Sequence, residues 1–224
     1  MRALDLFCGA GGAAMGLHRA GFTEIVGVDL RPQKNYPFTF VQADAMEYPL
    51  EGFDFIWASP PCQAYSVLAA MHPDRDYPDL VDDTRTRLVA VDCDYAIENV
   101  EGAPLARSSD LFGRHGVMLC GSMFGLGVDR GYLRRHRLFE TTFPVEQPEC
   151  RHVARAVGVY GHGGHSGKHR MLYRQEAAIA MGIDWMSRDE MTQAIPPAYS
   201  EYIGRAAMKR ITQVRREALG GRDV

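Results

Sequence analysis

The sequence predicts an α/β fold built on a doubly wound, mostly parallel sheet. Short apolar runs alternate with helical patterns through the first half of the chain, and a glycine-rich turn separates the first run from the first helix. The 224 residues correspond to one domain at the usual size of roughly 100–200 residues. With 46% hydrophobic and 24% charged residues and no internal repeat, the composition is globular and excludes fibrous and solenoid classes.

Short apolar runs in the first half are the predicted strands. Continuous apolar runs of this length are typical of strands that are buried on both faces of a parallel sheet. The predicted strands are residues 3–7, 25–28, 38–41, 53–58 and 95–100. Helical periodicity predicts a helix over residues 13–20, closed by Gly21, and a more polar helix over residues 80–91.

The second half is less regular. After Val117 the chain is rich in Gly and Arg, and no definite element is predicted as far as Lys168. Helical periodicity returns over residues 174–181 and 199–217, and the last few residues are expected to fray. Residues 141–173 are too few to fold alone, because segments below about 40 residues usually need disulfides or a metal. We therefore expect a single domain over residues 1–224 into which residues 141–173 are inserted as a short irregular loop or hairpin.

The cysteines do not indicate a disulfide framework or a thiolate zinc site. They are widely spaced, odd in number and without a CxxC pair: Cys8, Cys62, Cys93, Cys120 and Cys150. A second group of possible metal ligands matches no standard zinc spacing: Cys150, His152, His162, His165 and His169. We predict that no metal is bound.

Charge is distributed unevenly along the chain. The net charge is −3, yet residues 130–174 carry nine Lys and Arg against three Asp and Glu. A basic segment in an acidic protein suits a nucleic-acid or phosphate contact, although a solvated charged face has the same composition. The N-terminal apolar run is too short for a signal-peptide core, and no stretch reaches the roughly 18 apolar residues of a membrane span. We expect a cytoplasmic protein that does not contact a membrane.

The glycine-rich turn predicts a nucleotide-like ligand. It joins a predicted strand to a predicted helix, so its backbone N–H groups and the positive helix end face such a ligand. Gly9, Gly11 and Ala14 fit the G-x-G-x-x-A pattern, and Asp29 follows Gly9 by 20 residues. An acid at that position can accept hydrogen bonds from ribose hydroxyls of any adenosine-containing cofactor, and Asp44 is placed to contact an adenine edge. The pattern therefore leaves the identity of the cofactor open.

A cysteine and a carboxylate are predicted at the carboxyl edge of the sheet, where open α/β sheets bind their ligands. Cys62 follows Pro60 and Pro61, whose rings fix the backbone and present the thiol to the cleft. Glu98 ends the next strand, where partial desolvation would raise the pKa of its carboxyl group and make it a usable acid. If residues 134–137 are extended, Arg135 and Arg137 point to one face and can bind a carbonyl or phosphates.

Six motifs in this order resemble the DNA (cytosine-5) methyltransferase family. They are DLFCGAGG at 5–12, GVD at 27–29, SPPCQ at 59–63, ENV at 98–100, RRHR at 134–137 and AIPP at 194–197. The resemblance implies a compact member with an S-adenosylmethionine-dependent methyltransferase fold, and residues 141–173 would be its shortened target-recognition region. It would methylate C5 of cytosine in duplex DNA as a monomer, with the base flipped into the cleft, in a restriction-modification or phage setting.

The resemblance also implies residue roles. Catalysis at the base would involve Cys62 as nucleophile, Glu98 as acid, and Arg135 and Arg137. The residues implied to bind S-adenosylmethionine are Phe7, Gly9, Gly11, Gly12, Asp29, Asp44, Pro61, Gln193, Ala194 and Ile195. The candidates for DNA contact are Gln63, Ser66, Arg134, Lys168 and Arg170.

Three other functions compete with DNA methylation. An RNA methyltransferase would keep the same chemistry, because a related branch of the family modifies transfer RNA. No sequence feature favours it, but the short recognition segment removes the usual evidence for DNA. A non-catalytic nucleic-acid-binding relative is disfavoured by the presence of both Cys62 and Glu98. A nicotinamide-dependent oxidoreductase leaves the SPPCQ and ENV motifs unexplained.

Overall fold

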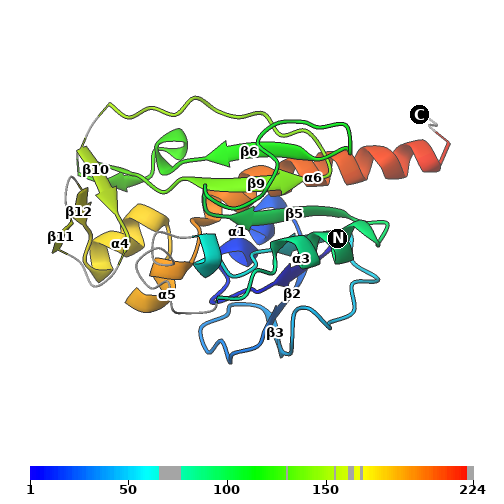
Figure 1. The fold of residues 1–224 in the computed structure, drawn as a ribbon, viewed down its shortest axis with the longest axis horizontal. Coiled ribbons are helices and arrows are strands. Elements are labelled where there is room, and N and C mark those ends of the chain that lie inside the picture. The colour runs from blue at the N-terminus through cyan, green and yellow to red at the C-terminus, as the bar shows by residue number, and fades with distance from the viewer. Residues whose placement is uncertain (66–76, 130, 154, 161–163, 167–168, 221–224) are drawn as a thin grey trace.

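A seven-stranded sheet forms the centre of the protein (Figure 1). The computed structural model describes residues 1–65, 77–129, 131–153, 155–160, 164–166 and 169–220. Its main sheet has the strand order β3-β2-β1-β4-β5-β9-β6. In chain order the strands are β1 (Arg2–Leu6), β2 (Glu24–Asp29), β3 (Thr39–Gln42), β4 (Phe55–Ala58), β5 (Asp94–Asn99), β6 (His115–Leu119) and β9 (Arg137–Thr141).

Strands β1 to β5 are parallel, and only β9 runs antiparallel to its neighbours β5 and β6 within the described sheet. This arrangement confirms the predicted doubly wound, mostly parallel sheet. Strands β6 and β9 were not predicted as elements, because their polar and glycine residues interrupt the apolar pattern. In the β6–β9 register Leu119 lies opposite Arg137, so Cys120 and His136 follow directly at the end of the pair.

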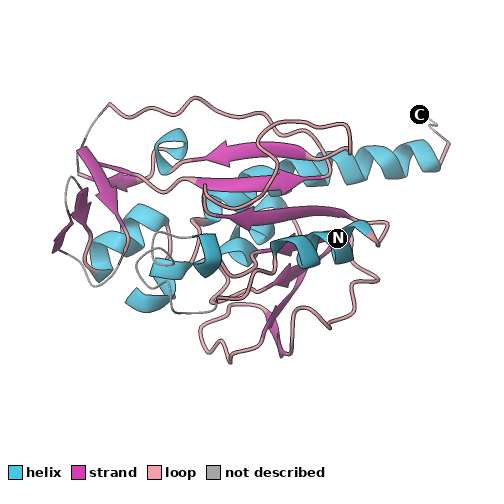
Figure 2. Ribbon diagram, in the orientation of Figure 1, coloured by secondary structure: helices cyan, strands magenta, loops and turns pink. Residues whose placement is uncertain are grey.

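Helices cover both faces of the main sheet (Figure 2). Helices α1 (Gly12–Ala20) and α6 (Pro197–Ala218) pack with Phe55 and Trp57 on one face, whereas α3 (Val81–Val89) packs with Ile56 and Ala58 on the other. The alternation along β4 is the period of two expected of a strand buried on both sides. The helices begin and end within a few residues of their predicted positions.

Helices α1 and α6 approach each other closely because glycines line their contact. A Cβ atom at Gly16 would lie 2.0 Å from the side-chain oxygen of Ser200, and one at Gly204 would lie 2.9 Å from Cβ of Ala20. Helix α6 begins with Pro197 at its first position, where a missing N–H costs nothing. The residues just before it are thereby held beside the glycine-rich turn.

A second sheet with the order β11-β12-β10-β8-β7 lies at one end of the molecule (Figure 1). Its strands are β7 (Gly127–Val128), β8 (Gly131–Leu133), β10 (Arg155–Gly158), β11 (Gly164–Ser166) and β12 (His169–Met171). It packs with helices α4 (Arg174–Met181) and α5 (Arg188–Gln193) around a third apolar cluster that includes Leu133, Val157 and Leu172. Strand β10 thus pairs with β8, which precedes β9 in the chain. Two- to four-residue strands carry too little periodicity to be predicted.

Within the described residues, no helix has the length and apolar character needed to cross a membrane.

Candidate active site

The predicted site residues gather at the carboxyl edge of the parallel strands. The glycine turn follows β1, Asp29 ends β2, the Pro60–Pro61–Cys62 loop follows β4, and Glu98 lies near the end of β5. Parallel neighbours deliver these groups to one edge, because each strand runs in the same direction. The order β2-β1-β4-β5 places the glycine turn between the acid of β2 and the cysteine loop of β4.

The glycine turn is shaped by left-handed backbone angles. Phe7, Gly9 and Gly11 have φ values of 57°, 48° and 84°. A Cβ atom at Gly9 would meet no atom within 4 Å, whereas one at Gly12 would lie 2.6 Å from the carbonyl oxygen of Ile195. Space for a ligand therefore remains beside Gly9, while Gly12 is required for the close approach of the 193–195 segment.

Asp29 and Asp44 are anchored by backbone N–H groups. The carboxylate of Asp29 accepts hydrogen bonds from the N–H of Gly9 at 3.0 Å and the N–H of Arg31 at 2.9 Å. Asp44 is exposed and accepts a bond from the N–H of Met46 at 2.8 Å. Since a carboxylate has about four acceptor positions, Asp29 keeps capacity for hydroxyl donors. Next to it, Leu30 is 68% exposed and offers an apolar surface at the same edge.

The 193–195 segment is attached to both the glycine turn and the arginine motif. Ile195 is buried against Gly12, and the carbonyl oxygen of Ala194 accepts a hydrogen bond from the Arg135 guanidinium at 2.7 Å. Gln193 is exposed. Trp185, which the sequence did not single out, donates its indole N–H to the carbonyl oxygen of Ala10 at 2.9 Å. No motif signals this residue, because it reaches the turn from a distant part of the chain.

The cysteine loop is fixed to strand β5. Asn99 is buried and donates its side-chain amide to the carbonyl oxygen of Pro60 at 2.9 Å. The carbonyl oxygen of Cys62 accepts a hydrogen bond from the N–H of Tyr65 at 3.0 Å, which closes the short 3-10 turn η1 (Gln63–Tyr65). Cys62 and Pro61 are half-buried. The asparagine of the ENV motif thus couples the two halves of the predicted catalytic pair.

Glu98 is nearly buried and lies against Arg137. The guanidinium Nε of Arg137 is 3.0 Å from Oε1 of Glu98. Burial raises the pKa of Glu98 above its usual value, although Arg137, Arg135 and a hydrogen bond with Ser59 act in the opposite direction. Ser59, which is placed by a 3.0 Å hydrogen bond from the Trp57 indole, is a site residue that the SPPCQ motif contains but that the sequence pattern did not single out.

The thiol of Cys62 responds to the same charges. Burial and the carboxylate of Glu98 raise the pKa of Cys62, whereas Arg137 and Arg135 lower it. The effects that raise the pKa of Cys62 outweigh those that lower it, so the thiol is mostly protonated before substrate binds. Protonation of Glu98 would remove its part of this effect, which links the ionisation of the two groups.

Arg135 and Arg137 make different contacts. Arg135 is fully buried and donates to the carbonyl oxygens of Val159 at 3.2 Å and Thr192 at 2.7 Å, in addition to Ala194. Arg137 lies at the start of β9 and contacts Glu98. The predicted period of two does not extend to Arg135, because this residue precedes the strand. Both positive charges nevertheless act on Cys62 and Glu98.

The candidates for nucleic-acid contact are dispersed. Gln63 and Arg134 are exposed, Gln63 on the cysteine loop and Arg134 beside the arginine motif. Arg170 forms ion pairs with Glu176 and, at 4.0 Å, with Asp129. Ser66 and Lys168 lie outside the described residues.

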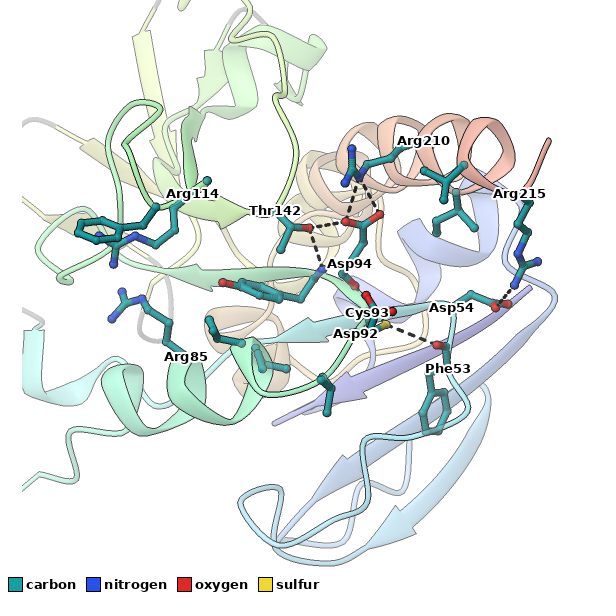
Figure 3. Close-up of a pocket in the computed structure, with 18 residues that line it drawn as sticks. Phe53, Asp54, Arg85, Asp92, Cys93, Asp94, Arg114, Thr142, Arg210 and Arg215 are labelled. Carbon is teal, nitrogen blue, oxygen red and sulfur yellow. Dashed lines mark hydrogen bonds and ion pairs between the residues drawn. The ribbon is translucent and has the colours of Figure 1, made fainter. Parts of the chain in front are cut away.

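A large cavity lies away from this site. Its volume is ≈ 960 Å³, and it lies at the opposite edge of the sheet, where Asp54 precedes β4 and Asp94 begins β5 (Figure 3). Two ion pairs line it: Arg210 bonds Asp94 at 3.0 Å, and Arg215 bonds Asp54. This cavity therefore does not coincide with the edge at which Cys62 and Glu98 lie.

Comparisons with known proteins agree with the motifs. Residues 1–88 match the model of the C-5 cytosine-specific DNA methylase family. No curated protein matches the chain significantly.

Solved structures match over nearly the whole chain. A prophage-encoded DNA modification methyltransferase of E. coli has a TM-score of 0.62 and 14% identity, covering 95% of this chain and 99% of that one. The Dnmt2 methyltransferase of S. pombe has a TM-score of 0.60 and 12% identity, with 94% and 99% covered. The methyltransferase EhMeth of Entamoeba histolytica has a TM-score of 0.57 and 12% identity, with 94% and 98% covered.

At these identities the structural matches establish the fold alone, and the similarity to the C-5 cytosine-specific DNA methylase family covers residues 1–88. The cofactor of that family is S-adenosylmethionine, and the open space beside Gly9 together with the Asp29 carboxylate fits an adenosyl group. The fold is that of an S-adenosylmethionine-dependent methyltransferase, and the similarity to the C-5 cytosine-specific DNA methylase family extends over residues 1–88.

Proposed function

We propose that this protein methylates C5 of cytosine in DNA, with Cys62 as the nucleophile and Glu98 as the acid. The observation that carries the proposal is the convergence of the Cys62 loop, Glu98 and Arg137 at one sheet edge, where Glu98 and Arg137 both act on the ionisation of Cys62. The family match of residues 1–88, which include Cys62, supports the same chemistry.

The reaction needs a nucleophile because C5 of cytosine is unreactive. The Cys62 thiolate adds to C6 of the ring, and the electron pair of the C5–C6 bond becomes available at C5. S-adenosylmethionine, held by Gly9 and Asp29, would supply the methyl group for C5, with S-adenosylhomocysteine as the leaving group. Removal of the C5 proton by a base restores the C5–C6 double bond and expels the Cys62 thiolate. Atoms and electrons therefore balance without an oxidant or reductant.

Glu98 would stabilise the ring during addition. Addition at C6 places negative charge toward N3, and a protonated carboxyl group can donate a hydrogen bond or its proton there. Its raised pKa favours the protonated form. Arg137 would hold the Glu98 carboxyl in position through the 3.0 Å contact. Ser59 would support the same carboxyl group through a hydrogen bond.

We assign the cofactor to the edge between β1 and β2. Phe7, Gly9, Gly11 and Gly12 would surround S-adenosylmethionine. Asp29 would accept from the ribose hydroxyls, and the exposed Leu30 would contact the adenine beside Asp44. Pro61 and the strip of Gln193, Ala194 and Ile195 would complete the binding surface.

Duplex DNA is the substrate that we favour, in line with the matched family and the prophage-encoded neighbour. Because C5 and C6 lie within the base stack, the cytosine would have to flip into the cleft, at a cost of a few kcal/mol. Gln63, Ser66, Arg134, Lys168 and Arg170 are the proposed nucleic-acid contacts. Protection of DNA in a restriction-modification or prophage context would follow from this activity.

Trapping of the covalent adduct tests the proposal. In DNA that contains 5-fluorocytosine, fluorine replaces the hydrogen at C5. A base cannot remove the fluorine as it removes a proton, so the Cys62–C6 bond persists after methyl transfer. We expect a denaturation-resistant complex with the wild type and with Cys93→Ser, a matched control outside the site, and none with Cys62→Ser.

The same assay with fluorinated RNA distinguishes the substrates. If only the RNA forms a complex, the proposed DNA substrate is wrong and the protein methylates RNA. A complex formed equally well by Cys62→Ser would overturn the mechanism, and the absence of a complex with either nucleic acid would support a non-catalytic binding protein.

A further inference from the structure

Four side chains that are distant in sequence meet beside the arginine motif. Cys120 follows β6, His136 precedes β9, and Cys150 and His152 lie in the loop between β9 and β10. One ligand atom of each residue lies within 4.8 Å of the others. The pairing of Leu119 with Arg137 brings Cys120 and His136 together, and the 142–153 segment adds the other two.

The distances fit a tetrahedral metal ion. Nε2 of His152 is 3.6 Å from Sγ of Cys120, and Nε2 of His136 is 3.4 Å from Sγ of Cys150. A tetrahedral zinc ion, with bonds of about 2.3 Å to sulfur and 2.0–2.1 Å to nitrogen, separates such ligand atoms by about 3.6 Å. The Cys150–His152 separation is shorter, at 2.8 Å. Only Arg151 separates these two residues in the loop, and His152 is exposed.

The surroundings of the four residues are those of a ligand set. The other ring nitrogen of His136 lies 3.6 Å from a carboxylate oxygen of Glu101, which is the outer partner that metal-bound histidines usually have. The Ser122 hydroxyl lies 3.5 Å from both sulfur atoms, where it can donate to a thiolate. The ring of His152 stacks on Tyr132 at 4.9 Å. Cys120 is buried, and His136 and Cys150 are half-buried.

We propose that Cys120, His136, Cys150 and His152 form a structural zinc site that fixes the 142–153 segment to the catalytic edge. Two thiolates and two imidazoles in tetrahedral array select zinc over calcium or magnesium, which prefer oxygen ligands. With four protein ligands the site is closed, as structural zinc sites are. His136 lies between Arg135 and Arg137, so the ion would hold the motif that contacts Glu98.

The site was not foreseen from the sequence, where the spacing of the cysteines argued against zinc. Cys120 and His136 are separated by 15 residues, and Cys150 follows after 13 more. Such separations match no short zinc motif, because two of the ligands are brought together by antiparallel strand pairing instead of by a single turn. Of the histidines considered with Cys150, only His152 belongs to this cluster within the described residues.

Metal analysis of the purified full chain tests the proposal. We expect one zinc ion per chain in the wild type and in Cys93→Ser, whose cysteine lies outside the cluster, and only background metal in Cys120→Ser and Cys150→Ser. Glu101→Gln, which keeps all four ligands, should bind zinc about 10–100-fold more weakly. Cobalt substituted for zinc should give thiolate charge-transfer and tetrahedral d–d absorption in the wild type, and neither in Cys150→Ser.

Thermal unfolding provides a second measurement that does not depend on activity. A chelator should lower the Tm of the wild type and leave the Tm of Cys150→Ser unchanged. Because Cys150 is on a half-exposed loop, this variant should fold even if Cys120→Ser does not. The proposal is wrong if the reduced wild type binds no zinc, if Cys150→Ser retains a full equivalent, or if Cys120 and Cys150 are joined in a disulfide.

Discussion

Nε of Arg137 lies 3.0 Å from Oε1 of Glu98, and both side chains are almost excluded from solvent, with exposed fractions of 12% and 10%. An ion pair so little exposed is positioned by the fold, because either charge alone would be costly to bury. Arg137 begins β9 and Glu98 lies in its neighbour β5, so antiparallel pairing sets their separation. The pair therefore links the arginine motif to the proposed acid.

Removing the Arg137 charge should impair methyl transfer more than removing an exposed arginine. In Arg137→Gln, Glu98 loses its partner and the pKa of Cys62 rises further, so less thiolate is available. We expect the single-turnover rate to fall by about 10²–10³-fold, the range for loss of one preorganised electrostatic contact. The matched control is Arg216→Gln, an exposed position in α6 outside the site. Equal losses in the two variants would contradict the assigned role.

The reactivity of the Cys62 thiol should depend on Glu98. The Glu98 carboxylate raises the pKa of Cys62, so its replacement in Glu98→Gln should lower that pKa and shift the alkylation profile toward lower pH. Mass spectrometry of iodoacetamide-treated protein measures each thiol separately. Cys93, whose pKa burial and nearby acids raise to about 12, serves as an internal reference that should not change. If the alkylation profile of Cys62 stays unchanged or shifts toward higher pH, the Glu98 carboxylate does not raise the pKa of Cys62.

The Asp5 carboxyl should make stability decrease as pH rises. Asp5 is fully buried, one of its oxygens has no hydrogen-bond partner, and burial raises its pKa well above the usual value despite hydrogen bonds from Tyr36 and the Ala14 backbone. The folded state thus binds the proton more tightly than the unfolded state. The resulting stabilisation is fully present below the unfolded pKa of about 3.9 and is lost as pH rises through the folded pKa, by about 1.4 kcal/mol for each pH unit between the two values.

Asp5→Asn should remove this dependence. In urea unfolding at several pH values, the free energy of unfolding of Asp5→Asn should vary less with pH than that of the wild type. Between acidic and neutral pH the variant should therefore lose less stability than the wild type. Asp92→Asn, at an exposed position, is the control and should follow the wild-type curve. A steeper dependence in Asp5→Asn would show that the carboxylate is stabilised in its charged form.

Two glycines of the turn should respond differently to a methyl group. Gly12→Ala places a Cβ atom against the Ile195 carbonyl and should cost about 1–3 kcal/mol of stability, as overpacking does. Gly9→Ala meets no neighbour and should cost only about 1 kcal/mol for its positive φ, while it occupies the space assigned to the cofactor. Calorimetry with S-adenosylmethionine should therefore find weaker binding in Gly9→Ala at temperatures where it is folded. Unchanged affinity for S-adenosylmethionine would show that the cofactor does not bind beside Gly9.

The predictable part of this protein is local. Apolar runs are readily identified as β1, β2 and β4, because most residues of a strand buried on both faces are apolar. The placement of Cys62 and Glu98 at one edge follows from the same argument, since parallel strands all end on one side. The interrupted β6 and β9, and the short strands of the second sheet, lack that signal and depend on partners far along the chain.

Long-range contacts account for the remainder. Nothing in the RRHR motif reveals that Arg135 is buried on backbone carbonyls while Arg137 meets Glu98, because the strand begins between them. The grouping of Cys120 and His136 with Cys150 and His152 likewise arises when β6 pairs with β9 and the following loop folds back. Periodicity and turn chemistry act over a few residues and can be recognised in one dimension, whereas a site assembled from separate segments exists only once hydrogen bonding between strands has brought them together.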